Sequence, residues 1–289
     1  MISKLQTYVL LNGRLTRARA ARISPLGEGF MFGRGLFETI KVRDGRPVFF
    51  REHAARLRRS AAALQLVLGA STRGLARRCA RLIAANGTRD GSLKIVAFDD
   101  TEGPGELILT REGTYAPEVY ARGFRLATAP DRHRPVAGFK TLNYLGNSVA
   151  RRRALAAGFD EALFIDPSGL VLEGAGSNMF AVAGGRVITP PLTEGILPGV
   201  ARAAVLRLIP QALRLMPHPL TLKRLLEADE VFVTNALLGV MPVSRIDRQQ
   251  FDLGRNPVTR ALAQAYRAAE LRSASQRVAR AARKSIAGA

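Results

Sequence analysis

The order in which strand-like and helix-like segments follow one another constrains the fold of this chain most strongly. Two hairpin signals come first, around Asn12-Gly13 and Asp44-Gly45. In the two segments that follow, 52–66 and 72–87, apolar residues recur at spacings of three and four, as in an amphipathic helix. Strand-like runs then return, beginning with SLKIVAF. Because strands and helices do not alternate strictly, the pattern predicts an α+β fold and not a doubly wound parallel sheet.

The length of 289 residues fits one large or two medium domains. The segment ATAPDRHRPVAG contains two prolines and few apolar residues, which is typical of a linker. We therefore predict an N-terminal α+β domain over residues 1–128, a linker over 129–137 and a C-terminal α+β domain over 138–289. The end of the second domain is rich in arginine and alanine, which predicts a basic terminal helix or tail.

The composition argues against several classes of site and partner. Cys79 is the only cysteine and cannot form an internal disulfide, and the three histidines lack the spacing of metal ligands. We therefore expect no metal. No stretch approaches the roughly 20 apolar residues of a membrane span, and the N-terminus lacks an apolar segment behind a basic start. We expect no membrane partner and a cytoplasmic location.

The net charge of +21 is open to two interpretations. Taken alone, such a charge would indicate nucleic acid or another anionic partner. Only six of the 44 basic residues are lysines, however, and the arginines are scattered along the chain between alanines and leucines. This distribution is typical of solvated helix faces, so we expect no specific nucleic-acid partner.

Lys140 lies in the run GFKTLNYLGNS, among small and apolar neighbours. In a chain that otherwise uses arginine for charge, a lysine in such surroundings can have a lowered pKa and act as an amine nucleophile toward a carbonyl. The alternative is an ordinary surface lysine at the start of a helix.

Two further segments could bind charged groups. Glu173 ends an apolar strand, and it is either a turn residue or a buried carboxylate that needs a cationic partner. Pro198 and Gly199 open a helix whose first backbone N–H groups, including those of Val200 and Ala201, could bind an anion.

Four runs of the sequence lie in the order in which one enzyme family has them: KTLNYLGNS, DEALFIDPSGLVLEGAGSNMFAV, ITPPLTEGILPGVAR and TNALLGVMPV. They resemble the class IV, fold-type IV pyridoxal-phosphate enzymes, which include branched-chain and D-amino-acid aminotransferases and 4-amino-4-deoxychorismate lyase. The run FGRGLFETIKVRDGRPVFFREHAARLRRSA is similar to the first domain of the same family. The resemblance implies a two-domain enzyme that acts on a small molecule, binds pyridoxal 5'-phosphate between its domains and is typically a homodimer.

The resemblance also implies roles for the matching residues. Lys140 would bind the cofactor covalently and carry the proton at the reacting carbon, Glu173 would face the pyridine nitrogen, and Tyr144 would lie beside the ring. Arg56 would bind the phosphate together with two groups of backbone donors. These donors are expected at the helix start, Val200 and Ala201, and in the loop at Asn235 and Ala236.

Departures from the aminotransferase patterns favour the lyase. The strand LKIVAF lacks the Tyr-x-Arg typical of branched-chain enzymes, and the Arg-x-His of D-amino-acid enzymes is missing beyond it. Both phosphate loops carry alanine, at Ala201 and Ala236, where those enzymes usually have threonine. The run NALLGVMPV looks most like the corresponding stretch of the lyases. We therefore expect a lyase that converts 4-amino-4-deoxychorismate to 4-aminobenzoate and pyruvate in folate biosynthesis, with Arg34 holding a substrate carboxylate.

Two alternatives stay open. One is a class IV aminotransferase acting on branched-chain or D-amino acids. The other is a relative that has lost catalysis and serves as a binding protein, although the presence of Lys140, Glu173 and Arg56 together argues against it. Arg34 could equally be a surface arginine at a turn.

Overall fold

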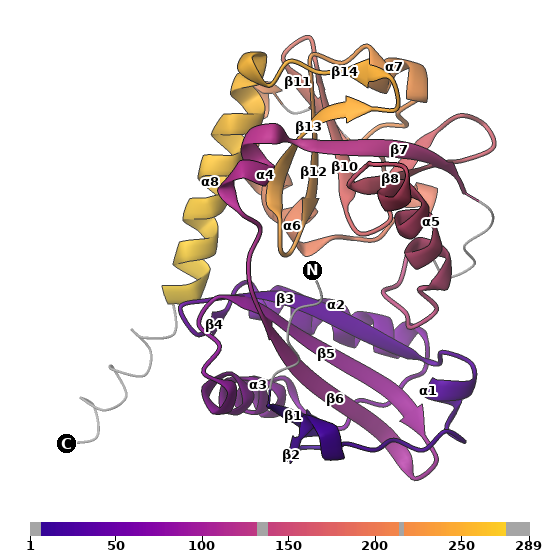
Figure 1. Ribbon diagram of the computed structural model, residues 1–289, viewed down its shortest axis with the longest axis vertical. Helices are drawn as coiled ribbons and strands as arrows, with labels where there is room; N and C mark the ends of the chain where they lie inside the picture. The colour runs from indigo at the N-terminus through magenta and orange to yellow at the C-terminus, as the bar shows by residue number, and fades with distance from the viewer. Residues whose placement is uncertain (1–6, 132–137, 214–216, 276–289) are drawn as a thin grey trace. The chain divides into compact units, whose positions relative to one another are not determined.

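The computed structural model describes residues 7–131, 138–213 and 217–275, which form two compact units (Figure 1). Of these residues, 7–114 and 267–275 belong to unit 1, and those between 115 and 266 belong to unit 2. This division differs from the predicted domain boundaries. The predicted linker begins inside strand β7, Phe124–Pro130, and its residues 132–137 lie outside the described residues. The last helix, α8 (Pro257–Ser275), begins in unit 2 and ends in unit 1.

Unit 1 contains a six-stranded antiparallel sheet in the order β2-β1-β6-β5-β3-β4. Both predicted hairpins are confirmed, because Asn12-Gly13 joins β1 to β2 and Asp44-Gly45 joins β3 to β4. All four turn residues have positive φ, as a type I′ turn requires. The strands are β1 Tyr8–Leu11, β2 Arg14–Arg17, β3 Gly35–Arg43, β4 Arg46–Pro47, β5 Gly91–Asp100 and β6 Gly103–Glu112.

Two helices, α2 (Phe50–Ala63) and α3 (Thr72–Asn86), pack against this sheet. They confirm the helices that the apolar spacing predicts. Ser71 caps the start of α3 by accepting a hydrogen bond from the Gly74 N–H, and Gly87 ends the helix at a φ of 63°. The remaining short helices of unit 1 are η1 Ala18–Ala20 and α1 Glu28–Met31.

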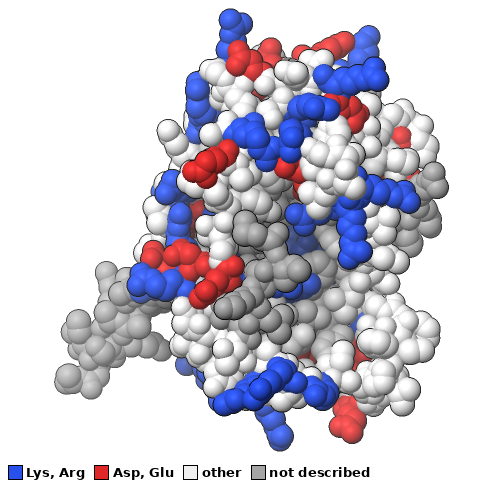
Figure 2. Space-filling view, viewed as in Figure 1, with Lys and Arg blue, Asp and Glu red and all other residues white. Residues whose placement is uncertain are grey.

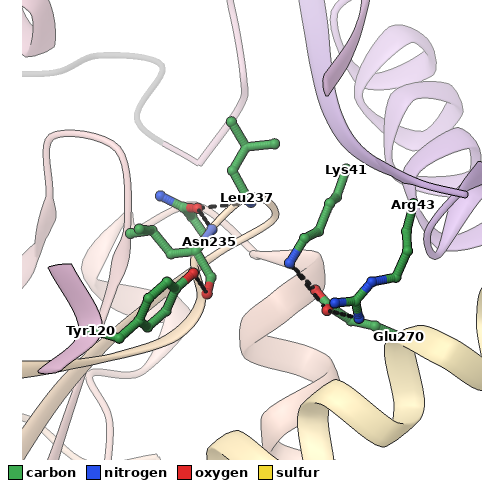
Figure 3. Close-up of polar contacts among 7 residues, drawn as sticks. Lys41, Arg43, Tyr120, Asn235, Leu237 and Glu270 are labelled. Carbon is green, nitrogen blue, oxygen red and sulfur yellow. Dashed lines mark hydrogen bonds and ion pairs between the residues drawn. The ribbon is translucent and has the colours of Figure 1, made fainter. Parts of the chain in front are cut away.

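The end of α8 is fixed to unit 1 by charge. Lys41 and Arg43 alternate along β3 with buried residues and therefore point to the opposite face of the sheet. Lys41 Nζ lies 3.0 and 3.1 Å from the two carboxylate oxygens of Glu270, and Arg43 Nη1 lies 3.3 Å from one of them (Figure 3). Because Glu270 is only 2% exposed, these ion pairs are shielded from solvent.

Unit 2 is built around a closed sheet. Its strands follow the order β11-β10-β12-β13-β7-β8-β9, and a further pairing of β9 with β10 closes a ring of six strands. The closing pair is Glu173 with Asn178. Strand β7 runs parallel to both β8 and β13. The strands besides β7 are β8 Glu161–Ile165, β9 Val171–Gly174, β10 Asn178–Ala183, β11 Arg186–Ile188, β12 Glu230–Asn235, β13 Gly239–Ile246 and β14 Gln249–Gln250.

The core of unit 2 is apolar, with Leu126, Leu163, Met179, Val233 and Met241 fully buried. The helices around it are α4 Pro117–Arg122, α5 Leu145–Ala156, α6 Val200–Leu208 and α7 Leu222–Leu226, with the short helices η2 Leu192–Glu194, η3 Gln211–Leu213 and η4 Leu253–Arg255. Helix α6 begins directly after Gly199, as predicted. Both units mix strands and helices without strict alternation, which confirms the predicted α+β class.

The described residues also give information on membrane spans, metal sites and surface charge. None of their helices combines the length and the apolar character needed to cross a membrane. Nor do they contain three His, Cys, Asp or Glu side chains grouped so as to hold a metal ion. The face shown in Figure 2 carries acidic side chains between the basic ones, so its charge is mixed despite the net charge of the chain.

Candidate active site

Glu173 lies where the barrel of unit 2 closes, and its side chain is 6% exposed. Its Oε2 accepts hydrogen bonds from the backbone N–H of Leu197 at 3.0 Å and from the side-chain amide of Asn178 at 3.2 Å. The same amide donates to the Leu197 carbonyl at 2.9 Å. The carboxylate is therefore buried and held in one orientation by the chain segment that leads to α6.

The segment 174–177, between β9 and β10, links several predicted residues. Tyr144, at the start of α5, donates its hydroxyl proton to the Ala175 carbonyl, and Asn147 donates to the same oxygen at 2.9 Å. Lys140 Nζ lies 5.5 Å from the centroid of the Tyr144 ring. Burial and the nearby carboxylates of Glu161 and Glu173 raise the pKa of Tyr144 above its usual value. Tyr144 therefore stays a neutral phenol near pH 7.

The start of α6 is buried, with Val200 at 7% and Ala201 at 3% exposure, and no side chain caps it. The first N–H groups of a helix have no partner within the helix, so a buried, uncapped start favours an anionic ligand. Gly199 at this point packs closely on Asn178, because a Cβ at Gly199 would lie 2.0 Å from the Asn178 Oδ1.

Asn235 ends β12 and shapes the loop to β13. Its Oδ1 accepts from the N–H groups of Leu237 at 2.9 Å and Leu238 at 2.8 Å (Figure 3). Its amide donates to the Gly176 carbonyl at 3.1 Å, which ties the loop to the segment 174–177. The Asn235 side chain thus binds the N–H groups of the two residues after Ala236 and not that of Ala236 itself.

The structure therefore brings together the predicted residues of unit 2. Tyr144 and Asn235 bind the segment 174–177 directly, and Glu173 precedes it. Asn178 connects Glu173 to the start of α6, and Lys140 lies near the Tyr144 ring.

The two predicted arginines belong to unit 1. Arg56 is 5% exposed and forms a bidentate pair with Glu38, from Nε to Oε1 at 2.8 Å and from Nη2 to Oε2 at 2.6 Å. Arg34 binds Asp99 and lies 3.3 Å from Glu28. The guanidinium of Arg34 is therefore already matched by acidic groups of its own unit.

Three buried polar residues were missed from the sequence: Glu38, Glu161 and Asn178. Glu161 is 3% exposed and accepts hydrogen bonds from the Gly176 N–H at 3.1 Å and the Ser177 hydroxyl at 3.3 Å. Burial is the main cause that raises its pKa to about 7. The signal that singles out Glu173, a carboxylate in an apolar strand, is also present at LFETI and EALFI and could have found both glutamates.

Comparison with known proteins first defines a class: the chain is a pyridoxal-phosphate-dependent enzyme with the fold-type IV architecture. It belongs to the amino-transferase class IV family, whose model matches residues 35–246. The predicted cofactor and fold type are thereby confirmed, and the chain acts on small-molecule substrates.

The relatives carry mostly aminotransferase names. A Methanocaldococcus jannaschii protein provisionally named branched-chain-amino-acid aminotransferase is 32% identical over 255 residues, 83% of this chain and 88% of that protein. The D-alanine aminotransferase of Bacillus licheniformis is 32% identical over 267 residues, 87% of this chain and 93% of that enzyme.

Solved structures give a similar result. The T.th. branched-chain amino acid aminotransferase with pyridoxamine 5'-phosphate superposes with a TM-score of 0.82 at 27% identity, covering 92% of this chain and 95% of that chain. A Legionella pneumophila protein provisionally named 4-amino-4-deoxychorismate lyase gives 0.80 at 26% identity, covering 88% and 97%. These findings favour the aminotransferase alternative over the predicted lyase.

Proposed function

We propose that the chain is an aminotransferase that moves the amino group of a branched-chain amino acid to a 2-oxo acid. The observation that carries this proposal is the similarity, in sequence and in fold, to proteins named branched-chain aminotransferases over most of the chain. A D-amino acid is the alternative donor, since an enzyme named D-alanine aminotransferase is similar over a comparable length.

The residues of unit 2 fit the cofactor. The buried, uncapped start of α6 suits a phosphate, because the N–H groups of Val200 and Ala201 point out of a helix end. The N–H groups of Asn235 and Ala236 are the donors that we assign to the second phosphate loop. Arg56 would add a guanidinium to this site, held in orientation by Glu38.

When bound, pyridoxal 5'-phosphate supplies an electron sink for the bond changes at the carbon that bears the amino group. Glu173 would keep the pyridine nitrogen protonated, since its carboxylate is fixed by the Leu197 N–H and by Asn178. Lys140 would bind the cofactor and then, once the substrate amine has displaced it, move the proton at the reacting carbon. Tyr144 donates its only hydroxyl proton to Ala175, so toward a cofactor oxygen it would act as an acceptor.

The lyase remains a second candidate on specific observations. The strand LKIVAF lacks Tyr-x-Arg, the phosphate loops carry Ala201 and Ala236, and the fold of the Legionella protein superposes almost as well. A lyase releases pyruvate from 4-amino-4-deoxychorismate and needs no second substrate, whereas an aminotransferase needs an amino acceptor.

The experiment distinguishes an aminotransferase from a lyase by whether the substrate's amino group is transferred to the cofactor. With L-leucine and no oxo acid, an aminotransferase converts one equivalent of cofactor to pyridoxamine 5'-phosphate and stops, and added 2-oxoglutarate restarts turnover. D-alanine is the parallel donor, and Lys140→Ala is the inactive control. Sustained release of 4-aminobenzoate from 4-amino-4-deoxychorismate, with no transfer from either amino acid, would refute the aminotransferase and establish the lyase.

We also propose that the enzyme is a homodimer. The segment around α1 exposes Leu26 at 78%, Phe30 at 62% and Phe32 at 68%, a concentration of apolar surface that marks interaction sites. Light scattering should give twice the chain mass, and Phe30→Asp with Phe32→Asp should give the monomer. Val67→Asp, at an exposed apolar residue elsewhere in unit 1, is the matched control. A monomeric wild-type protein would contradict this proposal.

A further inference from the structure

Glu161 is a buried carboxylate for which the proposed chemistry has no use. It begins β8 and is 3% exposed. Burying a carboxylate is costly unless hydrogen bonds compensate for the lost water. Its partners are therefore informative, and the two hydrogen bonds that it accepts both come from the segment 174–177.

The hydrogen-bond donors of this segment bind residues of strand β8. Glu161 Oε1 accepts from the Gly176 N–H at 3.1 Å and Oε2 from the Ser177 hydroxyl at 3.3 Å. Next along β8, the Ala162 carbonyl accepts from the Ala175 N–H at 2.9 Å. The segment is thus fixed through its donors by two consecutive residues of one strand.

The carbonyl groups of the same segment accept hydrogen bonds from residues of the candidate site. The Ala175 carbonyl accepts from Tyr144 and from Asn147, and the Gly176 carbonyl accepts from the Asn235 amide at 3.1 Å. A rotation of the peptide between Ala175 and Gly176 would move the Gly176 N–H and the Ala175 carbonyl together, because the peptide unit is planar. The acceptor position for Tyr144 therefore depends directly on what holds the Gly176 N–H. Asn235 binds the next carbonyl along the same segment, whose residue Ser177 is held to Glu161 through its hydroxyl.

We propose that Glu161 is a positioning residue that fixes the segment 174–177, and thereby sets where the Tyr144 ring and the Asn235 loop stand in the cofactor site. This inference rests on the proposed placement of Tyr144 beside the cofactor ring and of Asn235 at the phosphate. The role that we assign to Glu161 is exerted through its hydrogen bonds to Gly176 and Ser177.

The segment packs tightly at Gly174, and at Gly176 it lies in van der Waals contact with both Glu161 and Tyr144. A Cβ at Gly174 would lie 2.4 Å from the Ser177 hydroxyl and 3.2 Å from Glu161 Cγ. A Cβ at Gly176 would meet both Glu161 Oε2 and the Tyr144 hydroxyl at 3.8 Å. Glu161 and Tyr144 therefore flank the same glycine, so a change at one is transmitted to the other over a short distance.

The test compares Glu161→Leu, which removes both acceptors, with Glu161→Gln, which keeps a carbonyl acceptor for the Gly176 N–H. In the holoenzyme, Glu161→Leu should shift the absorption maximum of the bound cofactor and weaken its affinity at least fivefold. Glu161→Gln should restore the wild-type spectrum and most of the affinity. Ser177→Ala, a milder change, should weaken the affinity less, and it should add nothing when combined with Glu161→Leu.

A matched control is available in Glu230, which is 4% exposed, begins strand β12 and accepts hydrogen bonds from the N–H groups of Val258 and Thr259. Glu230→Leu should lower thermal stability to a similar degree and leave the cofactor spectrum and affinity unchanged. Equal effects of Glu161→Leu and Glu230→Leu on the spectrum would overturn the proposal, because the role would then be one of general stability. If Glu161→Leu does not fold, an unchanged spectrum and affinity in Ser177→Ala would overturn it.

A second measurement keeps this test separate from the proposed function. In cofactor-free protein carrying 13C-labelled tyrosine, the ring resonance of Tyr144 should move in Glu161→Leu and stay in place in Glu230→Leu. A moved resonance in a protein that performs neither candidate reaction would refute the proposed function and support the positioning role. An unmoved resonance would overturn the positioning role whichever reaction the enzyme performs.

Discussion

Replacing Glu38 with glutamine tests the buried cluster that holds Arg56. Glu38 is 1% exposed, accepts two hydrogen bonds from Arg56 and lies 2.7 Å from His53 Nδ1. Burial alone would raise the pKa of its carboxyl, but the hydrogen bonds and charges of His53 and Arg56 outweigh burial and lower the pKa to about 2. Glu38→Gln removes the negative charge and leaves the Arg56 guanidinium buried without it.

The magnitude follows from linkage. A carboxyl whose pKa is lowered from 4.5 to about 2 on folding stabilises the folded state above its unfolded pKa and loses that contribution as pH falls through the folded one. This lowering of the pKa corresponds to about 3 kcal/mol at pH 7 and about 1 kcal/mol at pH 3. Breaking a buried ion pair by removing one partner costs about 3–5 kcal/mol, which agrees.

Urea unfolding at a series of pH values measures this directly. At pH 7, Glu38→Gln should lower the free energy of unfolding by about 3 kcal/mol. The gap to wild type should stay near this value above the unfolded pKa of the carboxyl and narrow below it, toward pH 3. Glu102→Gln, at an exposed glutamate of the same unit, should follow wild type throughout. A constant gap between Glu38→Gln and wild type from pH 7 to pH 3 would refute the reasoning, because the stabilisation would then not depend on the charge of Glu38.

Three further predictions concern the cofactor. Borohydride reduction and peptide mapping should place the pyridoxyl group on Lys140, and label on Lys94 or another lysine would refute the assignment. Arg56→Ala should weaken cofactor affinity at least tenfold, since hydrogen bonds to charged groups contribute about 1.5–3 kcal/mol each; an unchanged dissociation constant would mean that the phosphate lies elsewhere. Gly199→Ala should displace the Asn178 amide that holds Glu173, lowering both cofactor affinity and turnover; wild-type values would show that Asn178 can yield without loss.

The local elements could be predicted because their signals are local. The hairpin at Asn12-Gly13 and the helix that begins after Gly199 depend on residues within a few positions of each other. The unit boundary could not be predicted in this way. The prolines in ATAPDRHRPVAG indicate a linker, yet Pro130 is the last residue of β7 and pairs with β8. A proline is tolerated there because it lies at the end of the strand.

The candidate site also contains residues that the sequence identifies and contacts that it does not. Glu173 was found from its strand, and Asn178 lies only five residues further along the chain. Its other donor, the Leu197 N–H, is 24 residues away and could not be identified from the strand alone. Arg34 was expected to hold a substrate carboxylate. Its partner Asp99 is 65 residues away and is identified only once β3 and β5 are paired. Long-range pairing, and not local propensity, decides these contacts.

The path of α8 has a consequence for the synthesis of the protein. Lys41 and Arg43 lie 229 and 227 residues before Glu270, the carboxylate that pairs with both of them. Domains generally fold as they leave the ribosome, the N-terminal one first. Here the first 114 residues emerge without the helix end that completes their unit, so Lys41 and Arg43 lack their Glu270 partner until residues 267–275 arrive. Translation of the last helix, rather than of the first domain, therefore sets when unit 1 can reach its final structure.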